Sequence, residues 1–242
     1  MGGLNNQLAV VTGASSGIGE SIACALAGKG VNLCLLGRDE SRLQRTSAQI
    51  SEHHSGVQIY SCDLMSAENI HSVATQITDA FPGIDILVHS AGCFLMKSLE
   101  ETTEADLDLL LSVNTRAPFI LSRLLLPNLK RNKGQIVFLN STVSQQKSRA
   151  GLSAYTASKY ALQAVADSLR EEVNASEVRV LSVYPGRTAT PMQEDIFRKE
   201  NREYEANQLL QPEDIANAVI NALVLPRTAE ITDIYIRPFR KA

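Results

Sequence analysis

The sequence has 242 residues, of which 44% are hydrophobic and 20% are charged. This length and composition are typical of one globular domain and exclude a mainly disordered or fibrous chain. The formal net charge of −3 and the lack of a long Lys/Arg run argue against nucleic acid as a partner.

Short β-branched or aliphatic runs alternate with longer amphipathic segments along the whole chain, which is typical of repeated βα units. We predict strands at 7–12, 31–36, 57–61, 85–88, 135–140, 178–184 and 231–236. The helices are predicted at 17–29, 40–53, 67–80, 103–131, 154–174 and 212–224. The predicted fold is therefore α/β and doubly wound, with a seven-stranded parallel sheet, helices on both faces and a single domain over 1–242.

The first predicted strand runs through Thr12 into a glycine loop that precedes the first helix. The loop reads Gly13-Ala14-Ser15-Ser16-Gly17-Ile18-Gly19. Glycines let the backbone approach a pyrophosphate closely, and the N–H groups at a helix start hold its negative charge. Turns need glycine anyway, so the argument depends on the position between an apolar strand and a helix. We predict that the cofactor is bound here by Gly13, Ser15, Ser16, Gly17, Ile18 and Gly19.

The spacing G-x-x-x-G-x-G between Gly13 and Gly19 resembles that of the short-chain dehydrogenase/reductase family. The resemblance covers essentially the full chain. It implies a seven-stranded Rossmann fold that binds NAD or NADP, an oxidoreductase that acts on CH–OH groups, and a homodimer or homotetramer.

The second predicted strand ends in Leu36-Gly37-Arg38 and carries no acidic residue at its end. A carboxylate there would bind a ribose 2′-hydroxyl and repel a 2′-phosphate. The guanidinium of Arg38 can instead pair with that phosphate, which favours NADP(H) over NAD(H). Alternatively, Arg38 only solvates the strand end, with Asp39 as its partner or as a displaced ribose acceptor.

The third and fourth predicted strands end in further residues that resemble cofactor contacts. Asp63 and Leu64 match the family's adenine contact, although an Asx turn or a helix cap explains Asp63 equally well. The stretch His89-Ser90-Ala91-Gly92 stands where the family usually has Asn-Asn-Ala-Gly. Ala91 and Gly92 still allow close approach to the cofactor, but the hydrogen bonds ascribed to the asparagines must be replaced or lost.

Asn114 lies inside the predicted helix 103–131, where asparagine is a poor helix former. The resemblance implies that Asn114 holds a water molecule that links Lys159 to solvent in a proton relay. The same helix carries an apolar stripe, which indicates a helix-on-helix core or a subunit contact rather than a ligand pocket. The stripe consists of Leu124, Leu125, Leu126 and Leu129.

Tyr155 and Lys159 are four residues apart and therefore share one face of the predicted helix 154–174. A tyrosine pKa of about 10 is too high for acid–base work at neutral pH, so we expect the Lys159 cation and an oxidised nicotinamide to lower it. Such a pair is common by chance but becomes specific beside the glycine loop. The resemblance implies that Tyr155 protonates the carbonyl oxygen during reduction and that Lys159 also hydrogen-bonds the nicotinamide ribose.

Ser141 follows the fifth predicted strand, where the family places the hydroxyl that polarises the substrate oxygen. It precedes Tyr155 by 14 residues (155 − 141). This is one residue more than the family spacing, which would select Thr142. We favour Ser141 because a surface loop absorbs an insertion more easily than a strand changes register.

Pro185 and Gly186 follow the sixth strand and resemble the family turn at the nicotinamide carboxamide, which Thr188 contacts through its backbone and Thr190 through its hydroxyl. The next segment, 187–211, is highly charged and has little apolar periodicity. A substrate lid and a solvated surface helix explain this segment equally well. Substrate specificity is expected in this segment and in the loops 93–98 and 143–152.

These features predict an NADPH-dependent reductase that converts a small ketone, a diketone or a 3-oxo acid to the hydroxy compound. The alternatives are a 3-oxoacyl thioester reductase of lipid synthesis and a non-catalytic NADP-sensing protein. The stretch 231–238 resembles small carbonyl and hydroxy-acid reductases more than the glycine-rich ending of acyl-carrier-protein reductases. A sensor could discard the four residues Asn114, Ser141, Tyr155 and Lys159, which this chain keeps together.

The remaining expectations concern location and metals. The N-terminus lacks the features of a signal peptide, and we find no run of about 18 apolar residues that would span a membrane, so a cytoplasmic location is expected. The four cysteines show no CxxC spacing and are expected to be reduced thiols. The four histidines show no ligand spacing, and no metal is expected.

Overall fold

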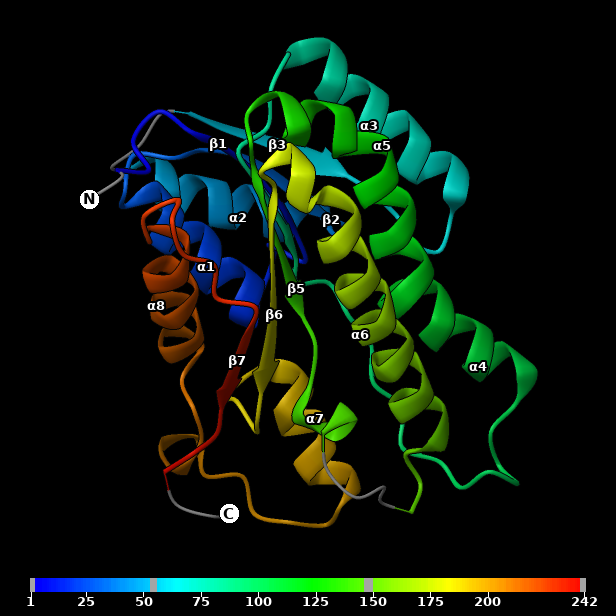
Figure 1. The fold of residues 1–242 in the computed structure, drawn as a ribbon. Helices are drawn as coiled ribbons and strands as arrows, with labels where there is room; N and C mark the ends of the chain where they lie inside the picture. The colour runs from blue at the N-terminus through cyan, green and yellow to red at the C-terminus, as the bar shows by residue number, and fades with distance from the viewer. Residues whose placement is uncertain (1–2, 53–55, 146–149, 240–242) are drawn as a thin grey trace.

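A seven-stranded sheet forms the centre of the computed structural model, which describes residues 3–52, 56–145 and 150–239 (Figure 1). All neighbouring strands are parallel, and their order is β3-β2-β1-β4-β5-β6-β7. The strands are β1 (Leu8–Thr12), β2 (Asn32–Gly37), β3 (Val57–Ser61), β4 (Ile86–His89), β5 (Gln135–Leu139), β6 (Arg179–Pro185) and β7 (Asp233–Ile236). This order confirms the doubly wound Rossmann fold. The direction of winding reverses between β1 and β4, which opens a crevice at the carboxyl ends of the strands.

Helices cover both faces of the sheet (Figure 1). On one face lie α1 (Gly17–Ala27), α2 (Glu40–Ser51) and α8 (Pro212–Leu223), and on the other lie α3 (Ala67–Ala80), α5 (Ala117–Arg131) and α6 (Ser153–Val173). Side chains alternate along a strand. In β1, Ala9 and Val11 therefore join the core under α1 and α8, whereas Leu8 and Val10 join the core under α3, α5 and α6.

The predicted helix 103–131 is interrupted in the structure. It consists of α4 (Glu104–Leu111), a π-helical turn (Ser112–Arg116) and α5. The predicted apolar stripe belongs to the core, because Leu125 and Leu129 are fully buried and Leu124 and Leu126 are partly buried against the same cluster. Of the two readings of this stripe, helix-on-helix packing is the one that the structure shows.

The helical stretch Glu104–Arg131 is long and apolar enough to meet a length and composition criterion for a membrane span. The stretch contains no continuous run of about 18 apolar residues, because charged residues such as Asp108 and Arg123 interrupt it, so the expectation that no such run exists is not contradicted. The second half of the stretch packs against α3 and α6, and its apolar side chains help to form the core over the sheet. The core helix of a globular domain meets the same criterion, because both must bury apolar side chains.

The charged segment 187–211 contains α7 (Pro191–Lys199) and a short 3₁₀ turn (Ala206–Gln208). Thr190 caps α7 by accepting a hydrogen bond from the backbone N of Gln193 at 3.2 Å. One side of α7 is buried through Gln193 and Phe197. The segment is thus neither a fully solvated helix nor a structureless loop.

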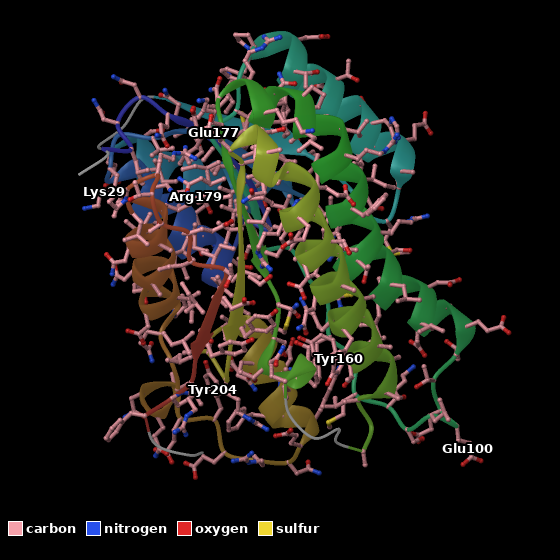
Figure 2. All side chains as sticks on the ribbon, viewed as in Figure 1. Lys29, Glu100, Tyr160, Glu177, Arg179 and Tyr204 are labelled. Atoms are coloured by element: carbon pink, nitrogen blue, oxygen red, sulfur yellow. The ribbon has the colours of Figure 1, made fainter. Side chains whose placement is uncertain are left out.

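Arg179 organises the amino-terminal edge of the sheet, far from the residues labelled Tyr160 and Tyr204 (Figure 2). Its guanidinium donates hydrogen bonds to the carbonyl oxygens of Leu223 at 3.1 Å and Ala229 at 2.8 Å. It therefore ties the start of β6 to the end of α8 and the chain that leads to β7. This polar network lies at the opposite end of the strands from the crevice.

Candidate active site

One cavity of about 550 Å³ lies at the carboxyl ends of the strands. The loops that follow each of the strands β1 to β6 contribute to its wall, as expected for a crevice at the switch point of a parallel sheet. The site residues predicted from sequence that line it are Gly13, Ser15, Ser16, Gly17, Ile18, Gly19, Arg38, Asp63, Leu64, Ala91, Gly92, Ser141, Tyr155, Lys159, Pro185, Gly186, Thr188 and Thr190. Asn114 is the predicted site residue outside this lining.

The glycine loop packs so closely that side chains are excluded from it. Gly13 has a φ of +67°, and a Cβ there would lie 2.7 Å from the backbone of Ala91. A Cβ on Gly19 would lie 2.3 Å from the carbonyl oxygen of Gly13. The Ser16 side chain makes no capping hydrogen bond to α1. The first N–H groups of this helix are therefore not bound by the side chain at its N-cap. This cradle suits a pyrophosphate at a helix N-terminus.

Asp39 is used by the start of α2 rather than by Arg38. Its carboxylate accepts hydrogen bonds from the Arg42 backbone N at 3.1 Å and the Ser41 hydroxyl at 2.7 Å, and these lower its pKa. The Arg42 guanidinium pairs with it at 3.3 Å. The suggested Arg38–Asp39 pair is therefore replaced by an Arg42–Asp39 pair. Arg38 and Arg42 both line the cavity, and the sequence reasoning missed Arg42.

Asp63 forms a turn at the end of β3 and also lines the cavity. One carboxylate oxygen accepts a hydrogen bond from the Met65 backbone N at 3.0 Å, which makes an Asx turn before α3. The cap of α3 is Ser66, whose hydroxyl accepts from the Asn69 backbone N at 3.2 Å. Asp63 and Leu64 also line the cavity, and the adenine contact expected of them stays a prediction.

Thr12 supplies hydrogen bonds at the end of β4, where the family motif has asparagines. Its hydroxyl oxygen accepts from the backbone N of Ser90 at 3.1 Å and of Ala91 at 3.2 Å. The same hydroxyl is within 3.3 Å of the Val88 carbonyl oxygen, to which it donates. The strand ends of β1 and β4 are therefore joined without a side chain from position 89 or 90.

His89 points into the core rather than into the cavity. It is 2% exposed, its ring stacks on Phe138 at a centroid distance of 4.9 Å, and its Nε2 lies 2.8 Å from the Ser122 hydroxyl. Burial lowers the pKa of His89 to about 3. The imidazole is therefore neutral in the native protein at neutral pH.

Acidification should destabilise the protein through His89. The pKa of His89 is about 3 in the native state and about 6.5 in the unfolded chain. Between these values only the unfolded chain binds the proton, so stability falls as pH falls through 6.5 and levels off near 3. We expect this group to reduce the free energy of unfolding by about 2 kcal/mol between pH 7.5 and 5.0. Urea unfolding at the two pH values measures this difference.

The control for this measurement is a pair of histidine variants. His89→Asn should lose this part of the pH dependence, whatever its effect on stability at pH 7.5. His71→Asn, which changes an exposed residue of α3, should keep it. An unchanged pH dependence in His89→Asn would show that other groups cause the acid sensitivity.

Tyr155 and Lys159 both line the cavity. Lys159 is 5% exposed, its Nζ donates to the Leu139 carbonyl oxygen at 3.0 Å, and burial lowers its pKa to about 8. The Tyr155 ring packs edge to face on Phe94 at a centroid distance of 4.8 Å. Burial raises the pKa of Tyr155 to about 12, and the neighbouring Ser141 hydroxyl acts in the opposite direction.

In the protein without a cofactor, burial outweighs any stabilisation of the phenolate, so the pKa of Tyr155 is raised; the combined effect expected of Lys159 and an oxidised nicotinamide stays a prediction. Desolvation disfavours the charged form of both groups, so it raises the pKa of the phenol and lowers that of the ammonium group. Spacing on a helix shows that two groups share a face, but it does not show how deeply they are buried. Tyr155 is therefore a protonated acid at neutral pH.

Ser141 and Thr142 take different places at the end of β5. Ser141 has an extended backbone, and its hydroxyl oxygen accepts from the Val143 backbone N at 3.3 Å. Thr142 begins the 3₁₀ turn Thr142–Ser144 and also lines the cavity. Because the Ser141 hydroxyl is the one that influences the pKa of Tyr155, the geometry favours Ser141 as its partner.

The side-chain amide of Asn114 is hydrogen-bonded to neighbouring parts of the protein through both its oxygen and its nitrogen. Its Oδ1 accepts from the Cys93 backbone N at 2.9 Å, and its Nδ2 donates to the Cys93 carbonyl oxygen at 3.0 Å and the Ser158 hydroxyl at 3.0 Å. Asn114 is fully buried within the π-helical turn. A water molecule held by this residue would therefore have to bind its main chain.

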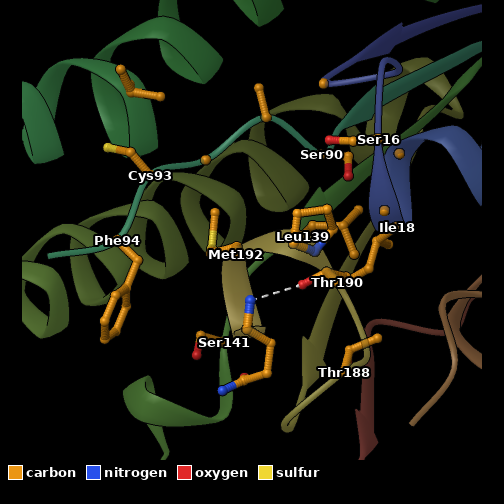
Figure 3. Close-up of a pocket in the computed structure, with 18 of the residues that line it drawn as sticks. Ser16, Ile18, Ser90, Cys93, Phe94, Leu139, Ser141, Thr188, Thr190 and Met192 are labelled. Carbon is orange, nitrogen blue, oxygen red and sulfur yellow. Dashed lines mark hydrogen bonds between the residues drawn. The ribbon is translucent and has the colours of Figure 1, made fainter. Parts of the chain in front are cut away.

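The cavity wall also contains residues that the sequence analysis did not single out. Phe94, Cys93 and Met192 lie around Ser141 in the close-up view (Figure 3). The additional lining residues include Leu109, Val113, Val143, Leu152, Arg187, Gln193, Ile196 and Glu200. Most of these residues fall in the loops where substrate specificity is expected, so their place in the sequence is the signal that could have identified them. Residues 146–149 of the predicted loop 143–152 lie outside the described residues.

Known proteins match this chain along its length. A short chain dehydrogenase family model matches residues 7–201. An uncharacterized oxidoreductase of Staphylococcus saprophyticus is 34% identical over 237 residues, which are 97% of this chain and 98% of that protein.

Solved structures also match this chain over nearly its whole length. A metagenomic short-chain oxidoreductase in complex with NADP is 31% identical with a TM-score of 0.85, over 99% of this chain and 100% of that one. An alcohol dehydrogenase from the archaeon Thermococcus sibiricus, complexed with 5-hydroxy-NADP, is 27% identical with a TM-score of 0.88, over 98% of this chain and 99% of that one.

Proposed function

The chain belongs to the short-chain dehydrogenase family, and from this membership we propose that it is an NADPH-dependent enzyme that reduces a carbonyl to a secondary alcohol. The proposed substrates are small ketones, diketones and 3-oxo acids. The observation that carries the proposal is the cavity that joins the glycine loop to Tyr155 and Lys159.

The residues present fit a dinucleotide with a 2′-phosphate. The cradle at Gly13 and Gly19, which a Cβ would fill, suits the pyrophosphate. Arg38 and Arg42 line the end of the cavity next to β2 and would pair with the 2′-phosphate. The NADP complexes of related structures support this choice. When bound, NADPH supplies the hydride for the reduction.

Tyr155 is the proposed acid. Because burial raises its pKa to about 12, it holds its proton at neutral pH and can donate it to a carbonyl oxygen. The Ser141 hydroxyl, which lines the same cavity, would donate a hydrogen bond to that oxygen and polarise the carbonyl. The phenolate that remains is stabilised by the cationic form of Lys159, on the same face of α6.

Lys159 is positioned for this role by its surroundings. The Nζ–Leu139 hydrogen bond fixes the ammonium group beside the end of β5. Gly92 lies beside it, and a Cβ built at Gly92 would be in ordinary van der Waals contact with Nζ at 3.8 Å. With a pKa of about 8, Lys159 is mostly protonated at neutral pH. It can still release a proton to restore the protonated form of Tyr155 after each turnover.

A substrate panel tests the proposal. Purified protein is mixed with NADPH or NADH and with ketones, diketones, 3-oxo acids and 3-oxoacyl thioesters, and the absorbance of the reduced nicotinamide is followed. We expect turnover of a ketone, diketone or oxo acid with NADPH. Preferred turnover of thioesters would favour a lipid-synthesis reductase, and NADPH binding without turnover of any compound would favour the sensing alternative.

A further inference from the structure

The part of the cavity beside Tyr155 has a mainly apolar wall. Phe94 contacts the Tyr155 ring, and the other apolar side chains that line the cavity include Leu109, Val113, Val143, Leu152, Met192 and Ile196. In a wall of this kind, the few polar groups orient the ligand and determine its chemistry. Two polar side chains, Gln193 and Arg187, both from the segment that follows β6, stand out in this wall.

Gln193 is a mostly buried residue whose side-chain amide is free to bind a ligand. The residue is 9% exposed and lines the cavity. Its backbone N is bonded to the Thr190 hydroxyl, which the dashed line in Figure 3 marks, but its side-chain amide makes no hydrogen bond to the part of the chain that the structure describes. A glutamine amide offers two donors and one acceptor. A ligand oxygen that faces this amide can therefore accept a hydrogen bond that no group of the described protein uses.

Arg187 adds fixed donors to the same wall. Its Nη2 donates to both carboxylate oxygens of Glu200, at 2.9 Å and 2.8 Å, and its guanidinium lies 4.8 Å from the centroid of the Phe197 ring. These contacts hold the planar group in one orientation. Its Nη1 is buried and has no hydrogen-bond partner within the described residues.

Glu200 decides which kind of oxygen this wall accepts. Its carboxylate neutralises Arg187 and lines the cavity itself, so a substrate carboxylate would meet a like charge there. The second cation near Glu200, Arg202, is 3.5 Å away with a side chain 39% exposed, and solvent screens it. An uncharged oxygen can accept from Gln193 or Arg187 without displacing Glu200.

We propose that Gln193 and Arg187 recognise a second, uncharged oxygen on the substrate. The substrate class is then a ketone with a neighbouring carbonyl or hydroxyl group, such as a diketone or a hydroxyketone, rather than a plain ketone or a free oxo acid. This inference rests on the proposed reductase function and narrows its substrate.

Kinetics with three compounds of equal chain length test the inference. The compounds are 2,3-pentanedione, 2-pentanone and 2-oxopentanoate, and kcat/KM with NADPH is measured for each. We expect the diketone to exceed both others by at least about tenfold, because a site built to hydrogen-bond a group discriminates against analogues that lack it. Equal values for the diketone and the plain ketone would overturn the inference while leaving the reductase function in place.

Gln193→Met tests the residue itself, because it keeps the side-chain length and removes the amide. The ratio of kcat/KM for the diketone to that for the plain ketone should fall about tenfold in this variant. Gln208→Met, at an exposed position of the same segment, should leave the ratio unchanged. An equal loss for both substrates in Gln193→Met would indicate a purely structural role and contradict the proposal.

Calorimetry separates this inference from the reductase function. The diketone is titrated into the protein with NADP⁺, so that no turnover is needed. Binding at least tenfold weaker to Gln193→Met than to the native protein would support recognition of the second oxygen even if the panel shows no reduction. Equal binding, or no binding to the native protein, would overturn it.

Discussion

Tyr155→Phe is expected to lower turnover by about 10³-fold, because general acid catalysis contributes roughly 10² to 10⁴ and phenylalanine has no proton to donate. The ring would keep its edge-to-face contact with Phe94, so the fold and the cavity should be retained. NADPH binding should change far less than turnover. Absorbance assays measure the rate, and NADPH fluorescence titration measures the binding.

Tyr160→Phe is the matched control for this experiment. Tyr160 lies on the same helix, α6, but is 48% exposed. This variant should keep the native rate. If Tyr155→Phe retained a tenth of the native rate, a group other than Tyr155 would have to be the acid.

Arg38→Ala and Arg42→Ala are each expected to weaken NADPH binding by about 10- to 100-fold, because a hydrogen bond to a charged group contributes about 1.5–3 kcal/mol. NADH has no 2′-phosphate, so its binding should change little. The ratio of the two dissociation constants, measured by fluorescence titration, gives the preference directly. The effect of Arg42→Ala should be at the low end, because Asp39 already neutralises part of its charge.

Arg45→Ala serves as the control for these variants. Arg45 is on the same helix, α2, but its side chain is 64% exposed and it is absent from the cavity lining. Removal of the Arg45 side chain should change the dissociation constants of NADPH and NADH by the same factor. The native protein could instead bind NADH as tightly as NADPH, with NADPH binding unchanged in both alanine variants. That outcome would indicate Asp39 as the acceptor of a ribose hydroxyl.

The fold could be predicted largely from local patterns. The central strands β1, β4 and β5 are short and fully buried, so they appear as mostly apolar runs. The edge strand β3 also spans the predicted 57–61, although it is only partly buried. The break in helix 103–131 could not be predicted in the same way. Its cause is tertiary, because the amide of Asn114 bonds the backbone of Cys93, 21 residues earlier in the chain.

In the candidate site, too, some features follow from local motifs and others from tertiary contacts. The glycine loop, Tyr155 and Lys159 follow local motifs, and the structure brings them to one cavity. The role of His89 depends on Ser122 and Phe138, which no local pattern connects to it. Gln193 was hidden within a charged segment, because its burial depends on how α7 packs over the cavity.

Gly17 and Thr190 limit how independently this protein can be engineered. A Cβ on Gly17, which has a φ of +57°, would lie 3.0 Å from the Thr190 methyl group, and Thr190 holds the first turn of α7 with Gln193. A change in the nucleotide loop at Gly17 therefore shifts the wall that selects the substrate, so its effects will not add to those of changes at Gln193. The proposed 2′-phosphate contact of Arg38 does not involve Thr190, so Arg38 is the position at which we expect a change of cofactor preference to leave the substrate range unchanged.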